Sequence, residues 1–343
     1  MLKSLTIKNF NQKDKELKLN LDGQNQSVIM SQDGLIYALY LFQKMVRSNK
    51  THDIFSTHEF GDLRKTIDYD FHIQIDNVDF QYKISVESKN KNRSYSNRTW
   101  ATVQSEELLI NNQQLYFRTS DGTVYDKNNN KIFKIQEDVL VFDKIQSHES
   151  YKVLNDLDVL FEIEKLDSWF RNMFLFSAKT NYIDGELHRF NVDLEYDASN
   201  FFDWLYCQGT QFTIELEQIL KKLINNFDSI QFDDVYDYVA TVSFNTADRN
   251  IKELDIDELS HEQKTLFIWA AIITLLKSNN SNKISFLLMD SMEQHISNDN
   301  LLYDLISETF SNAEKFTQVL IATNKEETRQ HFAHSTLSIL KSR

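Results

Sequence analysis

Apolar and polar positions alternate along the first part of the chain, which predicts strands with one buried face. Leu2–Phe10 and Glu16–Leu21 form an opening pair of strands, and Ser27–Met30 is a third, short and apolar strand. Ser31–Gly34 is a turn, and Leu35–Val46 is a dense apolar segment that predicts a buried helix. Strand, turn and buried helix together form the frame in which phosphate-binding loops are found.

The middle of the chain predicts a β-rich lobe followed by helices. Tyr69–Glu87 alternates as two strands, and Thr102–Gln136 continues the alternation, with Gly122 at a hairpin turn. Val139–Phe176 and Asn200–Phe227 carry apolar residues at three- and four-residue spacing, which predicts helices.

After these helices the pattern returns to strand and then to a strongly apolar helix. Gln231–Ser243 predicts strand. Ser260 and Gln263 fit a capping box, and the helix that follows, to Lys277, is apolar almost all round. Such a helix is expected to be buried on most sides.

The segment that organises the C-terminal part is the apolar run Ile284–Met289, which ends in Asp290. A buried parallel strand has this pattern, and it delivers its last side chain to the carboxyl edge of an α/β sheet. In nucleotide hydrolases an aspartate at this place helps to hold Mg²⁺. Asn300–Phe310 predicts an amphipathic helix, and Gln318–Ala322 predicts another buried strand before a final helix.

Composition narrows the function classes. The chain has 343 residues, 41% of them hydrophobic, with a formal net charge of -14 and a single cysteine, Cys207. An acidic chain repels phosphate backbones, so nucleic acid would need a basic partner or a local basic segment. Lys89–Arg98 is such a segment, although a solvated surface loop explains it more simply. One cysteine, no signal peptide and no run near the ~20 apolar residues of a membrane span predict a cytoplasmic protein.

The turn at Ser31–Gly34 lacks the groups that hold a triphosphate. A phosphate-binding loop needs a glycine-rich turn, a Lys for the β- and γ-phosphates and a Ser or Thr for Mg²⁺. Here there is one glycine and no Lys before the helix, and Tyr37 and Ala38 stand where the Lys and Ser would be in an ungapped comparison. The alternative is a loss of about four residues. An ordinary strand–turn–helix unit explains the same sequence.

His331 and His334 lie about one turn apart on the final helix, a spacing that two zinc ligands could use. Because no other cluster of ligand residues accompanies them, we predict no metal site there.

Taken in order, these segments resemble the compact ABC-type ATPases of the SMC/RecF kind. They resemble in particular the short AAA-type ATP-binding proteins of bacterial phage-defence and abortive-infection operons. MLKSLTIKNF is similar to their opening strand, and SQDGLIYAL stands where the Walker A loop would be. TVQSEELLINNQQLYFR resembles their inserted β-lobe, and ELSHEQKTLFIWAAII their signature motif and its helix. ISFLLMDSMEQHI resembles Walker B, and QVLIATN the strand before the switch histidine.

The resemblance implies an α/β fold, with an ABC-ATPase-like P-loop NTPase core sheet, an inserted antiparallel β-lobe and a helical subdomain. The implied divisions are 1–50 for the first part of the core, 51–138 for the lobe, 139–227 for the helices and 228–343 for the rest of the core.

For the site, the resemblance implies that this chain has lost most of the family's catalytic residues and retains few of them. Asp290 matches the Walker B aspartate and is the implied Mg²⁺ ligand, whereas Ser291 stands at the catalytic glutamate and Asn324 at the switch histidine. Glu293 matches an acidic residue common in the family and does not by itself replace the base. The other implied positions are Ser31, Gln32, Asp33 and Gly34 for nucleotide, and Leu259, Ser260, Glu262 and Gln263 for a signature that lacks its glycine and has His261 instead.

Three functions remain open at this stage. The first is a catalytically degenerate ATPase-like subunit, structural or regulatory, in a DNA-related or anti-phage defence complex. Its expected assembly is a homo-oligomer or a complex with an active ATPase, nuclease or toxin, and nucleic acid would be reached through that complex or through Lys89–Arg98. The second is an atypical active Mg-ATP-dependent ATPase, and the third is a nucleotide-independent interaction or sensor module. No cofactor is required, and weak binding of ATP and Mg²⁺ is left open.

Overall fold

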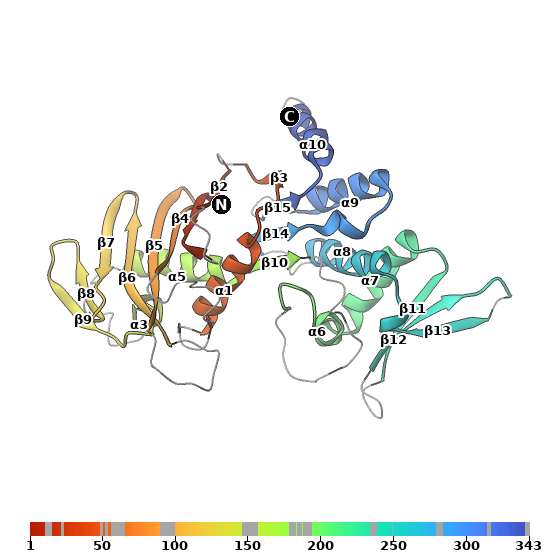
Figure 1. Ribbon diagram of the computed structural model, residues 1–343, viewed down its shortest axis with the longest axis horizontal. Coiled ribbons are helices and arrows are strands. Elements are labelled where there is room, and N and C mark those ends of the chain that lie inside the picture. Colours follow the sequence, from red (N-terminus) through yellow and green to blue (C-terminus); the bar gives the residue numbers. More distant parts are fainter. Residues whose placement is uncertain are drawn as a thin grey trace. The chain divides into compact units, whose positions relative to one another are not determined.

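The structure of the protein is a computed structural model, a mixed α/β fold (Figure 1). It describes residues 1–10, 16–21, 24–48, 51, 54–55, 66–89, 100–145, 157–177, 183, 187, 194–233, 239–248, 250–278, 284–313 and 317–339. The predicted basic segment Lys89–Arg98 lies outside these residues except for Lys89, where a strand ends. None of the described helices is long and apolar enough to cross a membrane.

The chain forms two compact units. Unit 1 comprises residues 1–25 and 32–173, and unit 2 comprises residues 26–31 and 174–343. A single strand of the N-terminal region thus belongs to the C-terminal unit. The finer four-part division expected from the sequence is not tested by these units and stays a prediction.

Unit 1 contains an antiparallel sheet of order β2-β1-β4-β5-β6-β7-β8-β9. Its strands are β1 Leu2–Lys8, β2 Leu17–Asn20, β4 Thr66–Ile75, β5 Val78–Lys89, β6 Trp100–Ile110, β7 Gln113–Arg118, β8 Thr123–Asp126 and β9 Lys131–Lys134. The helices of the unit are α1 Leu35–Ser48, α3 Val141–Ile145 and α5 Leu157–Arg171. The opening pair predicted from the sequence is confirmed, because Leu5 of β1 lies opposite Leu19 of β2. The same sheet continues through the β-rich lobe (Figure 1).

An aromatic cluster holds α1 and α5 to this sheet. The Phe42 ring of α1 lies 4.5 Å from Phe71, 5.2 Å from Tyr69 and 4.8 Å from Phe170 of α5, measured between centroids. The Tyr69 hydroxyl donates a hydrogen bond to Ala38 O at 3.1 Å, so the cluster contains a satisfied polar group. The dense apolar pattern that predicts α1 is therefore the pattern of a helix buried against a sheet.

A buried ion pair joins β6 and β7. Glu106 and Arg118 are each 1% exposed, and Arg118 Nη1 lies 3.7 Å from Glu106 Oε2. Glu106 also accepts hydrogen bonds at 3.1 Å from the hydroxyls of Tyr82 and Tyr116, and from the N–H of Val141, the first residue of α3. Burial raises the pKa of Glu106, and the Arg118 charge opposes that shift. The pair fixes where the lobe ends and α3 begins.

Gly122 makes the turn predicted between β7 and β8, with φ of +81°. A Cβ added there would stand 2.1 Å from Ile135 O, so the backbone would have to shift to make room for it. Gly209, with φ of +84°, has nothing within 4 Å of the corresponding position.

These two glycines give a matched pair of tests. We expect Gly209→Ala to lower the free energy of unfolding by about 1–3 kcal/mol, because φ of 84° with ψ of 170° is a backbone conformation that essentially only glycine adopts. Gly122→Ala is expected to cost more, because displacement of the Ile135 carbonyl is added to the penalty for a positive φ of +81°. Urea unfolding of both variants measures the difference, and equal costs would show that the turn shifts freely.

Unit 2 contains two sheets. The first has order β10-β14-β15-β3 and the second has order β11-β12-β13. The strands are β3 Gln26–Met30, β10 Met173–Ser177, β11 Phe227–Asp233, β12 Val239–Asn245, β13 Ile251–Asp255, β14 Phe286–Asp290 and β15 Gln318–Thr323. The α-helices are α6 Phe201–Gln208, α7 Thr210–Leu223, α8 His261–Lys277, α9 Asp299–Asn312 and α10 Glu326–Ile339, with short 3-10 helices η3 Ile256–Glu258 and η5 Met292–His295.

Helix α8 is buried over most of its length, as its composition predicts. Trp269 is fully buried, and its Nε1 donates to Thr309 Oγ1 of α9 at 2.8 Å. The capping box is confirmed: Gln263 N donates to Ser260 Oγ at 3.1 Å, and Ser260 N donates to Gln263 Oε1 at 2.9 Å.

The predicted and observed secondary structures differ at two places, one in Val139–Phe176 and one at β13. The predicted helical segment Val139–Phe176 ends in strand β10, because the apolar run from Met173 lies in a buried sheet. The strand character predicted for Gln231–Ser243 is confirmed in its described residues, which belong to β11 and β12. Strand β13 was not expected, because most of its residues are charged or exposed.

Candidate functional site at the carboxyl edge of the parallel sheet

Three parallel strands bring the candidate residues to one edge of the sheet in unit 2. In the register, Asp290 of β14 lies opposite Ala322 of β15, and Thr323 lies opposite Met30 of β3. The residues that follow these strands therefore meet at the carboxyl edge, as expected for Asp290. The predicted parallel strand that delivers a carboxylate is confirmed.

Asp290 is joined to the end of β3 by a short hydrogen bond. Ser31 Oγ donates to Asp290 Oδ1 at 2.6 Å, and Ser291 Oγ donates to the same oxygen at 3.2 Å. Ser31 N also donates to Thr323 O at 2.9 Å. Two of the predicted nucleotide-binding positions, Ser31 and Asp290, are thus brought together. The Ser31 hydroxyl donates its hydrogen bond to a carboxylate oxygen of Asp290.

Ser291, the position of the implied catalytic glutamate, has an unusual backbone. Its φ of 57° lies in the left-handed region, which non-glycine residues adopt at a cost of about 1–2 kcal/mol. Its N–H donates to Ala322 O at 2.9 Å, and its hydroxyl accepts from Asn324 Nδ2 at 3.0 Å. The residue is therefore held from β15 as well as from β14.

Glu293 and Asn324 complete the cluster. Glu293 is 4% exposed, and its Oε1 accepts from the Asn324 N–H at 2.7 Å. The acidic residue that the sequence assigns no role thus anchors the segment at the switch position. The neighbouring Lys325 donates to Asp299 Oδ1 at 2.8 Å, and this bond raises the Lys325 pKa.

We call Ser31, Asp290, Ser291, Glu293 and Asn324 the edge cluster. Its members bond to one another: hydroxyl to carboxylate, amide to hydroxyl and amide N–H to carboxylate. A catalytic site for phosphoryl transfer instead directs a cation and a base at its substrate. Among the described residues, these hydrogen bonds tie the ends of β3, β14 and β15 together.

Gln32, Asp33 and Gly34, the remaining predicted nucleotide positions, belong to unit 1. Gln32 Nε2 donates to Lys18 O at 2.7 Å, and Lys18 N donates to Gln32 Oε1 at 3.2 Å, so the Gln32 amide is bonded to β2. Gly34 has φ of 86°, as a turn before a helix requires.

The signature-like residues form the start of α8. Leu259 is buried, whereas Ser260 and Gln263 form the capping box. Glu262 Oε1 accepts from Ser297 Oγ at 3.2 Å and from Ser297 N at 3.3 Å. Their side chains are engaged in capping and tethering the helix, which are structural tasks.

No protein-family model matches the sequence, and no curated protein matches it. The chain is similar to an SMC head bound to the C-winged helix domain of ScpA, with 11% identity and a TM-score of 0.48 over 96% of this chain and 91% of that chain.

Two further SMC heads are similar over the same shares, 96% of this chain and 91% of each. They are the head domain from Thermotoga maritima, with 9% identity and a TM-score of 0.41, and a head with an extended coiled coil bound to the C-terminal domain of ScpA, derived from Pyrococcus furiosus, with 10% identity and 0.41. With identities of 9–11% and TM-scores below 0.5, these likenesses establish neither the fold family nor the role of any residue.

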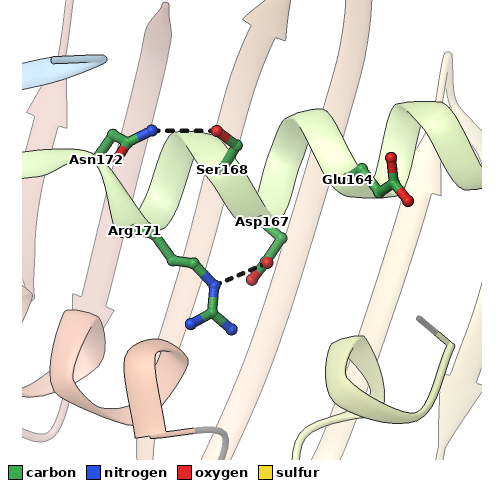
Figure 2. A pocket seen from close by; sticks show the side chains of 5 residues that line it. All are labelled: Glu164, Asp167, Ser168, Arg171 and Asn172. Atoms are coloured by element: carbon green, nitrogen blue, oxygen red, sulfur yellow. Dashed lines mark hydrogen bonds and ion pairs between the residues drawn. The ribbon is translucent and has the colours of Figure 1, made fainter. Parts of the chain in front are cut away.

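A hollow of about 500 Å³ lies along α5 of unit 1. Figure 2 shows its lining residues, Glu164, Asp167, Ser168, Arg171 and Asn172. Arg171 Nε donates to Asp167 Oδ2 at 2.8 Å, and Asn172 Nδ2 donates to Ser168 Oγ at 3.1 Å. These side chains mainly bond to one another along the helix, so the hollow does not compete with the edge cluster as a site.

Metal ligands do not gather elsewhere in the described residues, where no group of three His, Cys, Asp or Glu could hold an ion. The His331 ring stacks on Tyr303 with centroids 4.1 Å apart, and the His334 side chain lies outside the described part.

Proposed function

We propose that this chain is an ABC-type ATPase-like protein without useful hydrolysis, which acts as a structural or regulatory subunit of a DNA-related or anti-phage defence complex. The observation that carries the proposal is the edge cluster. The one carboxylate that matches a Mg²⁺ ligand, Asp290, accepts hydrogen bonds from two hydroxyls of its own chain, Ser31 and Ser291.

The chemical losses support the same conclusion. Hydrolysis requires a cation at the phosphates, a metal and a base that orients water. No Lys occurs between Met30 and Gln43, and Ser291 and Asn324 replace the groups expected at the base and switch positions. Each lost group commonly costs orders of magnitude in rate, at about 1.4 kcal/mol per tenfold. Together they leave architecture and assembly as the function.

As partner we propose an active ATPase, nuclease or toxin subunit, or a second copy of the chain. In ABC-type assemblies one partner's signature faces the other's nucleotide, so the start of α8 at Ser260 is the surface through which this chain would act. The missing glycine and the acidic Glu262 in that turn make it a weak phosphate ligand. We therefore assign the partner-facing role to assembly rather than catalysis.

The proposal predicts no ATP hydrolysis above background by the purified chain, and no change on Asp290→Ala. Calorimetric titration with Mg²⁺ and a non-hydrolysable ATP analogue is run in parallel on the parent, Asp290→Ala and Asp290→Asn. Asp299→Ala is the matched control, because it also removes a carboxylate from unit 2. That carboxylate is bonded to Lys325 and is not a member of the edge cluster. Hydrolysis that disappears in Asp290→Ala but persists in Asp299→Ala would overturn the proposal in favour of an atypical active ATPase.

The binding result separates the two forms of the proposal. Analogue binding that Asp290→Ala and Asp290→Asn both weaken identifies a ligand-controlled regulatory subunit. No binding identifies a structural subunit, whose partner capture is indifferent to nucleotide. A nucleotide-independent sensor module makes the second prediction too, and assembly with an active ATPase is the result that tells a subunit from it.

A further inference from the structure

Strand β13 lies at one edge of the three-stranded sheet (Figure 1), and four of its five residues are exposed, with Leu254 partly buried. Among the described residues β13 pairs on one side only, with β12. Ile251 is 60% exposed, a large value for an aliphatic side chain in a strand. A strand with one unpaired edge is a template for one more strand.

Backbone groups of alternate residues in β13 point away from β12. The hairpin closes with Thr246 N donating to Asn250 O at 2.8 Å, which makes this a hydrogen-bonded pair. In an antiparallel ladder such pairs alternate with pairs whose N–H and C=O groups face outward. By this alternation Lys252 bonds inward to β12, whereas Ile251 and Glu253 direct their backbone groups to the open edge.

The open edge carries negative charge. The Glu253 carboxylate is exposed and has no hydrogen-bonding or ionic partner among the described residues, and Asp255, Asp257 and Glu258 follow it, all exposed. Lys252 is the one basic residue of β13. Its side chain points to the opposite face of the strand from Glu253, because successive side chains alternate.

A second copy of the chain is a poor occupant of this edge. Two copies that pair antiparallel over the whole strand are related by a two-fold axis at Glu253, the central residue of β13. That arrangement sets two carboxylates directly opposite each other, which is destabilising. Pairing between the β13 edges of two copies is therefore unfavourable, and the edge favours a strand of opposite charge.

We propose that the open edge of β13 is a docking site for an extended basic segment of a partner protein, which adds to the sheet as an antiparallel strand. Lys or Arg of that segment lies opposite Glu253 and Asp255, and an apolar side chain lies opposite Ile251. Main-chain hydrogen bonds supply affinity, and alternate side chains supply specificity. The proposal is independent of nucleotide and of the role proposed for the edge cluster.

The test uses the full chain and the labelled peptide Thr-Lys-Val-Lys-Thr-Val-Thr, with fluorescence anisotropy as the readout. In antiparallel register its lysines fall opposite Asp255 and Glu253, and its second valine falls opposite Ile251. We expect the same peptide with Glu in place of Lys to bind at least about tenfold more weakly, since two attractive pairs become repulsive. Binding should fall as salt is raised.

Two substitutions at one position separate charge from main-chain pairing. Glu253→Gln removes the charge and is expected to weaken binding of the Lys peptide about threefold. Glu253→Pro also removes the outward N–H, at an edge position where proline is tolerated, and is expected to abolish detectable binding. Glu308→Gln removes an acid of α9 and is the matched control, with binding unchanged.

Equal binding of the Lys and Glu peptides would overturn the proposal. So would a Glu253→Pro chain that binds as well as Glu253→Gln, because attraction would then be purely ionic. Ile251→Pro removes the other outward N–H, and it keeps the test decisive if Glu253→Pro lowers the melting temperature. Absence of binding by the parent chain would also refute it.

Discussion

Replacing Arg118 by methionine is expected to lower the free energy of unfolding by about 3–5 kcal/mol. The reason is the Glu106 carboxylate, which would stay fully buried without the guanidinium that lies 3.7 Å away. Arg118 also donates to the carbonyl oxygens of Gln136 and Glu137, at 3.0 and 2.9 Å, and these bonds are lost as well. Urea unfolding followed by circular dichroism measures the loss.

A second substitution shows whether the buried charge is the cause. Glu106→Gln keeps an oxygen acceptor for the Tyr82 and Tyr116 hydroxyls and removes the charge. The double variant Glu106→Gln, Arg118→Met is therefore expected to be more stable than Arg118→Met alone by about 1 kcal/mol or more. A double variant that is no more stable than the single one would assign the loss to packing around Arg118.

The same pair predicts a pH dependence. Burial raises the pKa of Glu106 above the ordinary value of a glutamate carboxyl even with Arg118 present, and removing the cation raises this pKa further. A carboxyl whose folded pKa is raised binds its proton more tightly in the folded state, so stability falls as pH rises from the unfolded to the folded pKa. Arg118→Met should thus lose more stability at pH 8 than at pH 5, and the double variant should lose this difference. Parallel melting curves at the two pH values check it.

The sequence predicts the elements best where burial decides the pattern. Phe286–Met289 and Val319–Ala322 are continuous apolar runs, and both lie in buried parallel strands in the structure. Burial of this kind leaves few alternatives, because a short apolar run bounded by polar residues fits a covered sheet. The carboxylate at the end of the first run could be placed for the same reason.

Strands that are stabilised mainly by neighbouring strands of the same chain are hard to predict from the local sequence pattern. β13 has a mostly charged sequence, and it is a strand because its hairpin partner β12 supplies the hydrogen bonds. β10 follows α5 with no turn signal beyond Asn172, and an apolar run of its length fits helix and strand equally.

The edge cluster shows the same limit for function. Ser31 and Asp290 are 259 positions apart in the sequence, and their hydrogen bond exists because β15 lies between β14 and β3. No local pattern contains that strand order. The sequence could propose each residue as a remnant of a nucleotide site, whereas their mutual hydrogen bonds became visible only with the register of the sheet.

The second large effect is expected at Trp269, where truncation to alanine should lower the free energy of unfolding by about 3–5 kcal/mol. Trp269 is fully buried in α8, and its Nε1 donates to Thr309 Oγ1, which itself donates to Leu305 O at 2.7 Å. Thr309→Val removes the acceptor and leaves the indole N–H buried, at a cost of about 1–3 kcal/mol. Trp269→Phe removes the donor and leaves a threonine that still bonds to Leu305.

A double-mutant cycle on Trp269→Phe and Thr309→Val then isolates the bond between α8 and α9. With both partners apolar no buried donor is left unsatisfied, so we expect the double variant to lose less than the sum of the single losses, by about 1 kcal/mol. Strict additivity of the two single losses would contradict the hydrogen bond.

The result bears on function because α8 begins at Ser260. If the turn at Ser260 serves assembly, Trp269→Phe should weaken partner capture only as far as it destabilises α8. Ser260→Ala should weaken partner capture beyond its effect on stability. Capture and unfolding measured on the same preparations of these variants distinguish the two roles.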